Sequence, residues 1–221
     1  MNIIDELEWR GAINQQTDAE GLYKLVDQKS ISLYCGIDPT GDSMHIGHLI
    51  PFMILKRFQL AGHHPVILIG GGTGAIGDPS GRTTERVLQT AEQVKHNADS
   101  LTAQMKKLFG EDGSFTMMNN YDWLSKISLL DFLRDYGKLF NINTMLAKDV
   151  VASRMETGIS FTEFSYQILQ SIDYKMLYEK CGVQLQIGGA DQWGNITNGI
   201  ELIRKTNETH EAFGLTIPLM L

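Results

Sequence analysis

The apolar residues of the chain follow two patterns, namely short continuous runs and residues spaced three or four positions apart. The continuous runs predict strands over 31–37, 65–70, 115–118 and 184–187. The spaced residues predict helices over 18–29, 46–61, 90–109, 161–180 and 191–206. Because strands alternate with helices, and 65–70 is apolar throughout like a strand buried on both faces, we expect a doubly wound α/β fold with a parallel sheet and helices on both faces.

Residues 121–154 form a helical but irregular region within this alternation. The region has more aromatic and aliphatic residues than one helix face needs: Trp123, Leu129, Leu130, Phe132, Leu133 and Phe140. Such a surplus either covers a partner surface or builds an ordinary helical core, and the pattern leaves both interpretations open.

The final residues, 215–221, form an apolar run that resembles the entry to a buried strand. Chains usually finish in polar, loosely held residues. We therefore expect a truncated chain; a C-terminal strand tucked into a sheet is the alternative.

Composition and charge narrow the class of protein. With 221 residues, of which 43% are hydrophobic and 20% charged, the chain can build one sizeable core. The formal net charge of −7 argues against a general polyanion binder, because nonspecific nucleic-acid affinity needs many Lys and Arg contacts. Cys35 and Cys181 lie far apart and match no metal-type spacing, so we expect a reduced, cytoplasmic setting. The first ten residues do not resemble a secretion signal, and no apolar run reaches the length of a membrane span.

A strand, a turn and a helix follow one another over 33–48. The helix starts with His45 and His48, whose three-residue spacing places both imidazoles on one face of the first turn. Backbone N–H groups and the positive end of the helix dipole point the same way, so this turn suits an anion. A surface turn with two solvated histidines is the alternative.

The glycine-rich loop over 70–82 invites two nucleotide-binding interpretations. Residues 72–77 match the dinucleotide fingerprint formally, but the acidic residue that the motif needs would fall near Glu92, inside a predicted helix. A Walker A loop is disfavoured because Ile76 and Arg82 stand where its first Gly and its Lys are needed.

Three charged residues in this loop or shortly after it remain candidates for ligand binding. Asp78, at the carboxyl end of a strand, could hold an amine, and Arg82 and Arg86 could bind phosphate. Solvated loop charges are the alternative for each of them.

The predicted helix 161–180 has a polar column beside its apolar side. Tyr166, Gln170 and Asp173 recur at i, i+4 and i+7, so they share one face. Their hydrogen-bonding atoms without a positive charge suit an ammonium group and a hydroxyl better than an anion. A solvated helix face is the alternative.

Residues 184–195 repeat the order of strand, glycine turn and helix start. A carboxylate such as Asp191 at a helix N-cap can pair with ribose hydroxyls, although a plain N-cap is a frequent use of Asp. The sequence contains no Gly-x-Ser-x-Gly elbow, no His-Glu-x-x-His motif and no zinc-type Cys/His spacing.

Four motifs taken together resemble those of the bacterial tyrosyl-tRNA synthetases, over the whole chain. They are His45-Ile46-Gly47-His48, Gly77-Asp78-Pro79-Ser80-Gly81, the column Tyr166, Gln170 and Asp173, and Gly188-Gly189-Ala190-Asp191-Gln192. The resemblance implies a Rossmann-like class I catalytic domain over 1–221. It also implies activation of L-tyrosine by ATP to tyrosyl-adenylate and pyrophosphate, followed in the whole protein by transfer of tyrosine to tRNA(Tyr).

The resemblance assigns residues to tyrosine. Tyr34 and Asp173 match the pair that grips the phenolic hydroxyl, and Gln192 matches a residue near the carboxylate. The residues that match holders of the α-ammonium group are Asp78, Tyr166 and Gln170.

The resemblance also assigns residues to ATP. The catalytic residues that bind the phosphates and stabilise departing pyrophosphate match His45, His48 and Thr40, with a mobile basic loop at Arg82 and Arg86. Position 82 is often Lys in relatives. The residues that match the nucleotide and ribose pocket are Cys35, Gly36, Asp38, Gly47, Gly189 and Asp191. Mg²⁺ is expected with the phosphates, and no metal bound by the protein itself.

The chemistry agrees with these assignments. A carboxylate that attacks the α-phosphorus of ATP needs neither a general base nor an enzyme nucleophile, so catalysis rests on positioning and on donors aimed at transition-state charge. Selection of tyrosine over phenylalanine needs buried partners that go unpaired without the hydroxyl, a rule for which tyrosyl-tRNA synthetases are themselves the usual illustration.

The family has a second signature loop, Lys-Met-Ser-Lys-Ser or a variant, and tRNA-binding domains, none of which this sequence contains. We therefore expect the chain to bind tyrosine or its adenylate but to activate tyrosine slowly and to charge tRNA poorly or not at all. The family forms homodimers through a helical insertion, which would be 121–154. No membrane partner is expected.

Three rival functions remain. A nucleotidyltransferase that joins another small acid to AMP explains the histidines but leaves Tyr34, Tyr166, Gln170 and Asp173 unexplained. A binding module that senses tyrosine or docks a partner without catalysis fits the missing loop. An NAD-binding domain is disfavoured by the misplaced acidic residue.

Overall fold

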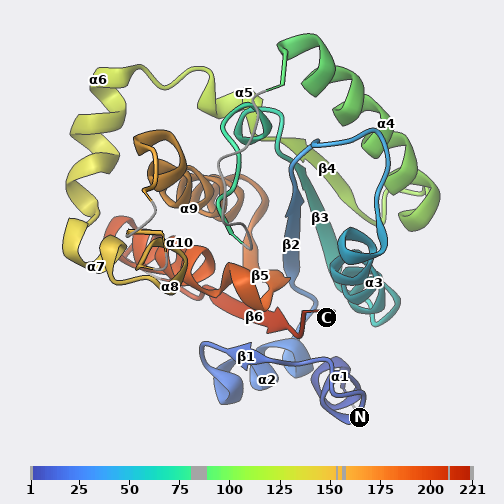
Figure 1. The fold of residues 1–221 in the computed structure, drawn as a ribbon. Coiled ribbons are helices and arrows are strands. Elements are labelled where there is room, and N and C mark those ends of the chain that lie inside the picture. Colours follow the sequence, from blue (N-terminus) through green and yellow to red (C-terminus); the bar gives the residue numbers. More distant parts are fainter. Residues whose placement is uncertain (1, 81–88, 153, 156–157, 209, 220–221) are drawn as a thin grey trace.

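The computed structural model describes residues 2–80, 89–152, 154–155, 158–208 and 210–219. A six-stranded sheet forms its centre, in the order β1-β6-β5-β2-β3-β4 (Figure 1). The strands are β1 (Gln15–Gln16), β2 (Ser32–Ile37), β3 (His64–Ile69), β4 (Thr116–Asn119), β5 (Val183–Gly189) and β6 (Phe213–Ile217). Only β1 runs antiparallel to its neighbour β6, whereas the other four pairings are parallel. The predicted parallel α/β sheet is therefore confirmed.

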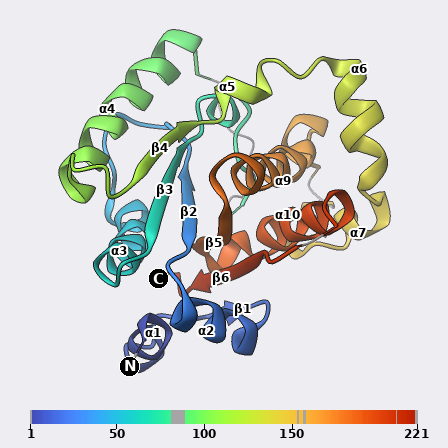
Figure 2. The same ribbon diagram turned by 180° about the vertical axis from the view of Figure 1, so that it is seen from behind.

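Two groups of helices cover the two faces of the sheet, as Figures 1 and 2 show from opposite sides. One core, between α1 to α4 and the sheet, includes Leu22, Leu55 and Leu101, and the other, beneath α9 and α10, includes Ile172 and Leu202. The longer helices are α1 (Ile3–Trp9), α2 (Ala19–Gln28), α3 (Ile46–Leu60), α4 (Ala91–Phe109), α9 (Phe161–Cys181) and α10 (Trp193–Thr206). The predicted doubly wound arrangement is thus correct, and each predicted helix is present.

The sequence patterns missed two elements at the N-terminus. Helix α1 is held by a capping box, in which the side chain of Asn2 accepts backbone N–H groups and Asp5 accepts the N–H of Asn2. Strand β1 is only two residues long and pairs with Leu215 and Thr216, far away in the sequence. Neither element has the length that a periodic apolar signal needs.

The region 121–154 consists of short helical segments, as expected. They are α5 (Tyr121–Leu124), α6 (Leu129–Asp131), a π-helical turn (Phe132–Tyr136), a 3₁₀ turn (Gly137–Leu139), α7 (Ile142–Leu146) and α8 (Asp149–Ala152). Trp123 and Met145 are buried in the core beneath α9. By contrast, Leu129, Leu130 and Leu133 are exposed, so only part of the apolar surplus is used inside the chain.

The apolar residues near the end of the chain form β6, which starts at Phe213, two residues before the predicted run. Leu215, Thr216 and Ile217 are buried between β5 and β1. No helix among the described residues is long and apolar enough to cross a membrane.

Candidate active site

A pocket of about 350 Å³ opens at the carboxyl ends of β2, β3 and β5. In parallel α/β sheets this edge is the usual place for a ligand. Every predicted site residue within the described ranges lines the pocket. They come from β2, α3, α9, the end of β5 and the turns that follow β2, β3 and β5. Arg82 and Arg86 lie outside the described residues, so their place is not assigned.

The two histidines form one wall of the pocket. His45 is the N-cap of α3, and its Nδ1 accepts the backbone N–H of His48 at 3.4 Å. The two rings stack with their centroids 3.6 Å apart. A side chain at Gly47 would press against the His45 ring, so glycine keeps this turn close to the pocket. The predicted pairing of the imidazoles at the helix start is confirmed.

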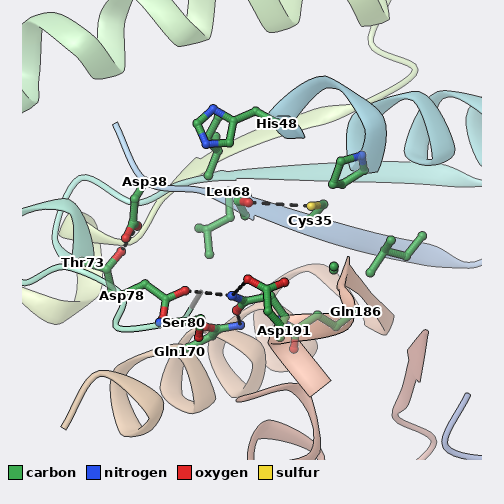
Figure 3. A pocket seen from close by; sticks show the side chains of 18 of the residues that line it. Cys35, Asp38, His48, Leu68, Thr73, Asp78, Ser80, Gln170, Gln186 and Asp191 are labelled. Atoms are coloured by element: carbon green, nitrogen blue, oxygen red, sulfur yellow. Dashed lines mark hydrogen bonds between the residues drawn. The ribbon is translucent and has the colours of Figure 1, made fainter. Parts of the chain in front are cut away.

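Figure 3 shows His48 on one side of the pocket, with Asp78, Gln170 and Asp191 across from it. Asp191 lies within a 3₁₀ turn (Ala190–Gln192) that precedes α10, rather than at the N-cap of a helix, where both sequence interpretations placed it. Burial and the charge of Asp78 raise the pKa of the Asp191 carboxyl.

The polar column of α9 faces the pocket rather than solvent. Tyr166 is 6% exposed and Asp173 is 2% exposed, so the alternative of a solvated helix face is wrong. Asp173 accepts hydrogen bonds from Asn120 Nδ2 at 2.9 Å and from Trp123 Nε1 at 2.8 Å. Burial nevertheless raises the pKa of the Asp173 carboxyl to about 8.

Tyr34 lies near Asp173 in the wall of the same pocket. Its Oη is buried and has no hydrogen-bond partner among the described residues. Burial and the neighbouring charge of Asp173 raise the pKa of the Tyr34 phenol well above its ordinary value. A buried hydroxyl without a partner costs about 1–3 kcal/mol, so this end of the pocket is ready for a polar ligand group.

A second polar cluster lies where β3 and β5 end. Gln192 Nε2 donates to Asp78 Oδ2 at 2.8 Å, and Gln170 Nε2 donates to Gln192 Oε1 at 3.2 Å. Asn195 Nδ2 donates to Gln170 Oε1 at 3.0 Å. Tyr166 also lines this pocket, and its hydroxyl donates to Asp38 Oδ2 at 2.9 Å. Carboxylate and amide oxygens of this kind suit an ammonium ion.

The strand β2 exposes a stretch of backbone beside the histidines. Gly36 is exposed, and a Cβ there would meet no protein atom closer than 3.8 Å, so the missing side chain leaves room for a ligand. Cys35 is buried, and burial raises the pKa of its thiol to about 12, so it stays protonated at neutral pH. At Gly189 a Cβ would meet the Asp191 carboxylate and the Leu219 side chain.

Five pocket residues or their supports were missed by the sequence patterns: Thr73, Asn120, Trp123, Gln186 and Asn195. Asn120 follows β4, so the rule that ligands bind beyond strand ends could have found it. Gln186 is buried with its Oε1 unpaired among the described residues, which no local sequence signal reveals.

The described residues contain no group of three or more His, Cys, Asp or Glu side chains placed to hold a metal ion. Both cysteines are free thiols in the structure.

Comparison with known proteins agrees with this geometry. Residues 26–221 match the family model described as tRNA synthetases class I (W and Y). The chain is 77% identical to tyrosine–tRNA ligase 1 of Enterococcus faecalis and 75% identical to tyrosine–tRNA ligase of Latilactobacillus sakei, in each case over the whole chain. It covers 53% of each of these proteins, so the chain spans about half the length of the curated relatives it matches.

Two solved structures show the same fold. A C-terminally truncated mitochondrial tyrosyl-tRNA synthetase of Aspergillus nidulans is 34% identical, with a TM-score of 0.87 over all of this chain and 69% of that one. A tyrosyl-tRNA synthetase of Archaeoglobus fulgidus, complexed with L-tyrosine, has a TM-score of 0.78 over all of this chain and 65% of that one, at 20% identity. The second likeness supports the fold alone.

Proposed function

Because the chain belongs to the class I tyrosyl-tRNA synthetases, we propose that it is the catalytic core of a tyrosine–tRNA ligase. The proposed reaction joins the carboxylate of L-tyrosine to the α-phosphorus of ATP, while the bond from that phosphorus to pyrophosphate breaks. In the whole protein the tyrosyl group would then pass to tRNA(Tyr).

One observation supports tyrosine as the substrate most directly. The pocket has polar groups at two ends, with Tyr34 Oη and Asp173 at one end and the cluster around Asp78 and Gln170 at the other. Tyrosine matches this arrangement, because its phenolic hydroxyl and its ammonium group lie at opposite ends of the molecule. Phenylalanine would leave the buried groups of the first end unpaired, which is the basis of selection.

ATP would lie between the histidines and the turn after β5. His45, His48 and Thr40 line this side, and the start of α3 adds the positive end of its dipole. Donors aimed at the departing pyrophosphate stabilise the transition state without an acid–base residue. We assign the ribose to Gly36, Gly189 and Asp191, with Cys35, Asp38 and Gly47 beside them. Arg82 and Arg86 remain proposed phosphate ligands, and Mg²⁺ would enter bound to the phosphates.

The wider assignments follow from the same family. We propose a cytoplasmic homodimer whose interface includes the exposed leucines of 121–154. Slow activation of tyrosine and poor charging of tRNA by the 221-residue chain remain predictions, which pyrophosphate exchange and aminoacylation assays test.

Calorimetric titration with tyrosine, phenylalanine, ATP and NAD tests the proposal. We expect tyrosine binding that is stronger than phenylalanine binding and that is lost in Asp173→Ala. Asp99→Ala is the matched control, because Asp99 is an exposed carboxylate paired with Lys95 on α4. Thermal unfolding of each variant shows whether it is folded.

The rival functions give different results in the same titration. NAD binding would refute the proposal, and equal binding of tyrosine and phenylalanine would favour a nucleotidyltransferase for another acid. Tyrosine binding without any pyrophosphate exchange would favour a binding module.

A further inference from the structure

A continuous series of hydrogen bonds, from Asp38 to Asp173, joins the two ends of the proposed tyrosine site. Thr73 Oγ1 donates to Asp38 Oδ1 at 2.6 Å and accepts from Asn120 Nδ2 at 2.9 Å. Asn120 Nδ2 also donates to Asp173 Oδ2 at 2.9 Å. Thr73 therefore lies midway between two carboxylates that come from different elements. Figure 3 shows the Thr73 hydroxyl next to Asp38 at the edge of the pocket.

The donor and the acceptor of every hydrogen bond in this series are determined. The backbone N–H of Gly72 donates to Asn120 Oδ1 at 2.7 Å, so the amide nitrogen of Asn120 must face Thr73 and Asp173. Both hydrogens of that nitrogen are then used. Since Thr73 already accepts one of them, its own single hydrogen points to Asp38. Rotating the amide by 180° would break three bonds at once.

The two carboxylates at the ends of this series also accept hydrogen bonds from residues outside it. Asp38 Oδ2 accepts the hydroxyl of Tyr166, and Asp173 Oδ1 accepts the indole N–H of Trp123. The two middle residues of this series are buried, since Thr73 is 2% and Asn120 is 1% exposed. At such positions a lost hydrogen bond leaves the partner group unpaired, so its geometric effect passes to the next group.

We propose that Thr73 is a positioning residue. Through Asn120 it holds the Asp173 carboxyl where that group can bind the tyrosine hydroxyl, and it connects Asp173 to Asp38 at the other end of the site. This inference rests on the proposed function. Thr73 does not touch the phenol end itself, so its hydroxyl acts on selectivity only through the Asn120 amide. Because the same hydroxyl also donates to Asp38, a change at one end of the site alters the hydrogen bonds at the other end.

The test compares Thr73→Val, which keeps the shape and removes the hydroxyl, with Thr73→Ser, which keeps the hydroxyl. Competition calorimetry on the 221-residue chain gives the affinities for tyrosine and for phenylalanine. We expect Thr73→Val to weaken tyrosine binding about tenfold, as for a lost hydrogen bond to a charged group, with little change for phenylalanine. Thr73→Ser should recover most of the tyrosine affinity. Thr102→Val on α4 is the control, because its hydroxyl donates only to the Ala98 carbonyl.

A purely structural role for Thr73 predicts another result, namely equal weakening of tyrosine and phenylalanine, and that result would overturn the inference. So would an unchanged preference for tyrosine in Thr73→Val. If Thr73→Val does not fold, Thr73→Ala removes the same hydroxyl. In the Asn120→Ala background, Thr73→Val should cause no further loss of preference. A wild-type chain that shows no preference for tyrosine would refute the proposed function instead.

Discussion

The residue whose surroundings say most about binding is Tyr34. Its hydroxyl is buried without a partner, whereas the ring of Tyr174, 5.3 Å away, belongs to a residue whose hydroxyl donates to the Phe213 carbonyl oxygen at 2.7 Å. Among the described residues, the hydroxyl of Tyr174 thus has a hydrogen-bond partner, whereas the hydroxyl of its neighbour Tyr34 has none. An unsatisfied buried group has an energetic cost that a ligand can remove.

This difference gives a matched pair of substitutions. In Tyr34→Phe the free energy of unfolding of the ligand-free chain should rise by up to about 1–3 kcal/mol, because the unpaired buried hydroxyl is removed, while tyrosine affinity falls. Tyr174→Phe should lower the free energy of unfolding by about 1–3 kcal/mol, because it leaves a buried backbone group unpaired. Chemical denaturation and calorimetry measure the two effects. A loss of stability in Tyr34→Phe equal to that in Tyr174→Phe would show that Tyr34 Oη has a partner in the free protein.

The carboxyl of Asp173 makes stability depend on pH. Burial raises its pKa from 3.8 to about 8, so between these values the folded state keeps a proton that the unfolded state releases. Stability is therefore lost as the pH rises from about 4 to about 8, at up to about 1.4 kcal/mol per pH unit for this group, and the loss ends above pH 8.

Comparison with Asp173→Asn isolates this contribution, because the other titrating groups are common to both proteins. We expect the variant to gain stability relative to the wild type between pH 5 and pH 8, measured by denaturation at each pH. A difference that stays constant with pH would mean that Asp173 titrates at its ordinary value.

At the scale of elements, α9 links the tyrosine site to the region 121–154. Arg154, the last residue of that region, donates to Glu163 Oε2 at 3.0 Å in the first turn of α9, and both side chains are buried. Arg154 also donates to the Gly158 carbonyl oxygen, so it ties together the connection between the two elements. The helix that presents Tyr166 and Asp173 is thus anchored at its start by a buried ion pair.

Removing one partner of this pair should be costly. We expect Glu163→Gln to lower the free energy of unfolding by about 3–5 kcal/mol, because the Arg154 charge stays buried. Glu179→Gln on the same helix is the control, since Glu179 pairs with Lys175 nearer the surface and should cost at most about 1 kcal/mol. Urea denaturation gives both values. Equal small losses would show that water reaches Arg154 in the variant.

At the scale of the whole molecule, the exposed apolar residues of 121–154 bear on whether two copies of the chain associate. Leu130 is 76% exposed, with Leu129 and Leu133 beside it in sequence, while Trp123 of the same region is buried. Scattered apolar residues are normal on a surface, but a group of them suits an interface. This supports the proposed dimer.

Leu130→Asp should shift the chain toward monomer, because a carboxylate would be buried in the interface. Static light scattering at micromolar concentration measures the mass of wild type and variant. Leu60→Asp, at an equally exposed leucine at the end of α3, should leave the mass unchanged. A wild-type chain that is monomeric at this concentration would contradict the proposed interface.

The sequence by itself determined the elements that bury one face or both. The strand predicted at 65–70 and the helix predicted at 161–180 appear as β3 and α9 with ends displaced by at most one residue, because their apolar spacing is a local property. It also predicted the site residues, and all of those within the described ranges line one pocket. Parallel strands end at the same edge, so residues distant in sequence were expected to meet there.

The tertiary structure alone decided how these residues are paired. The partners of Asp173 include Asn120 and Trp123, 53 and 50 positions away, and those of Asp38 include Thr73 and Tyr166, 35 and 128 positions away. No periodic pattern encodes such distances, because a hydrogen bond depends on where whole elements lie. The same reason explains why the Tyr34 hydroxyl has no partner among the described residues. When the sheet and α9 pack together, no donor or acceptor of these residues reaches it in hydrogen-bonding geometry.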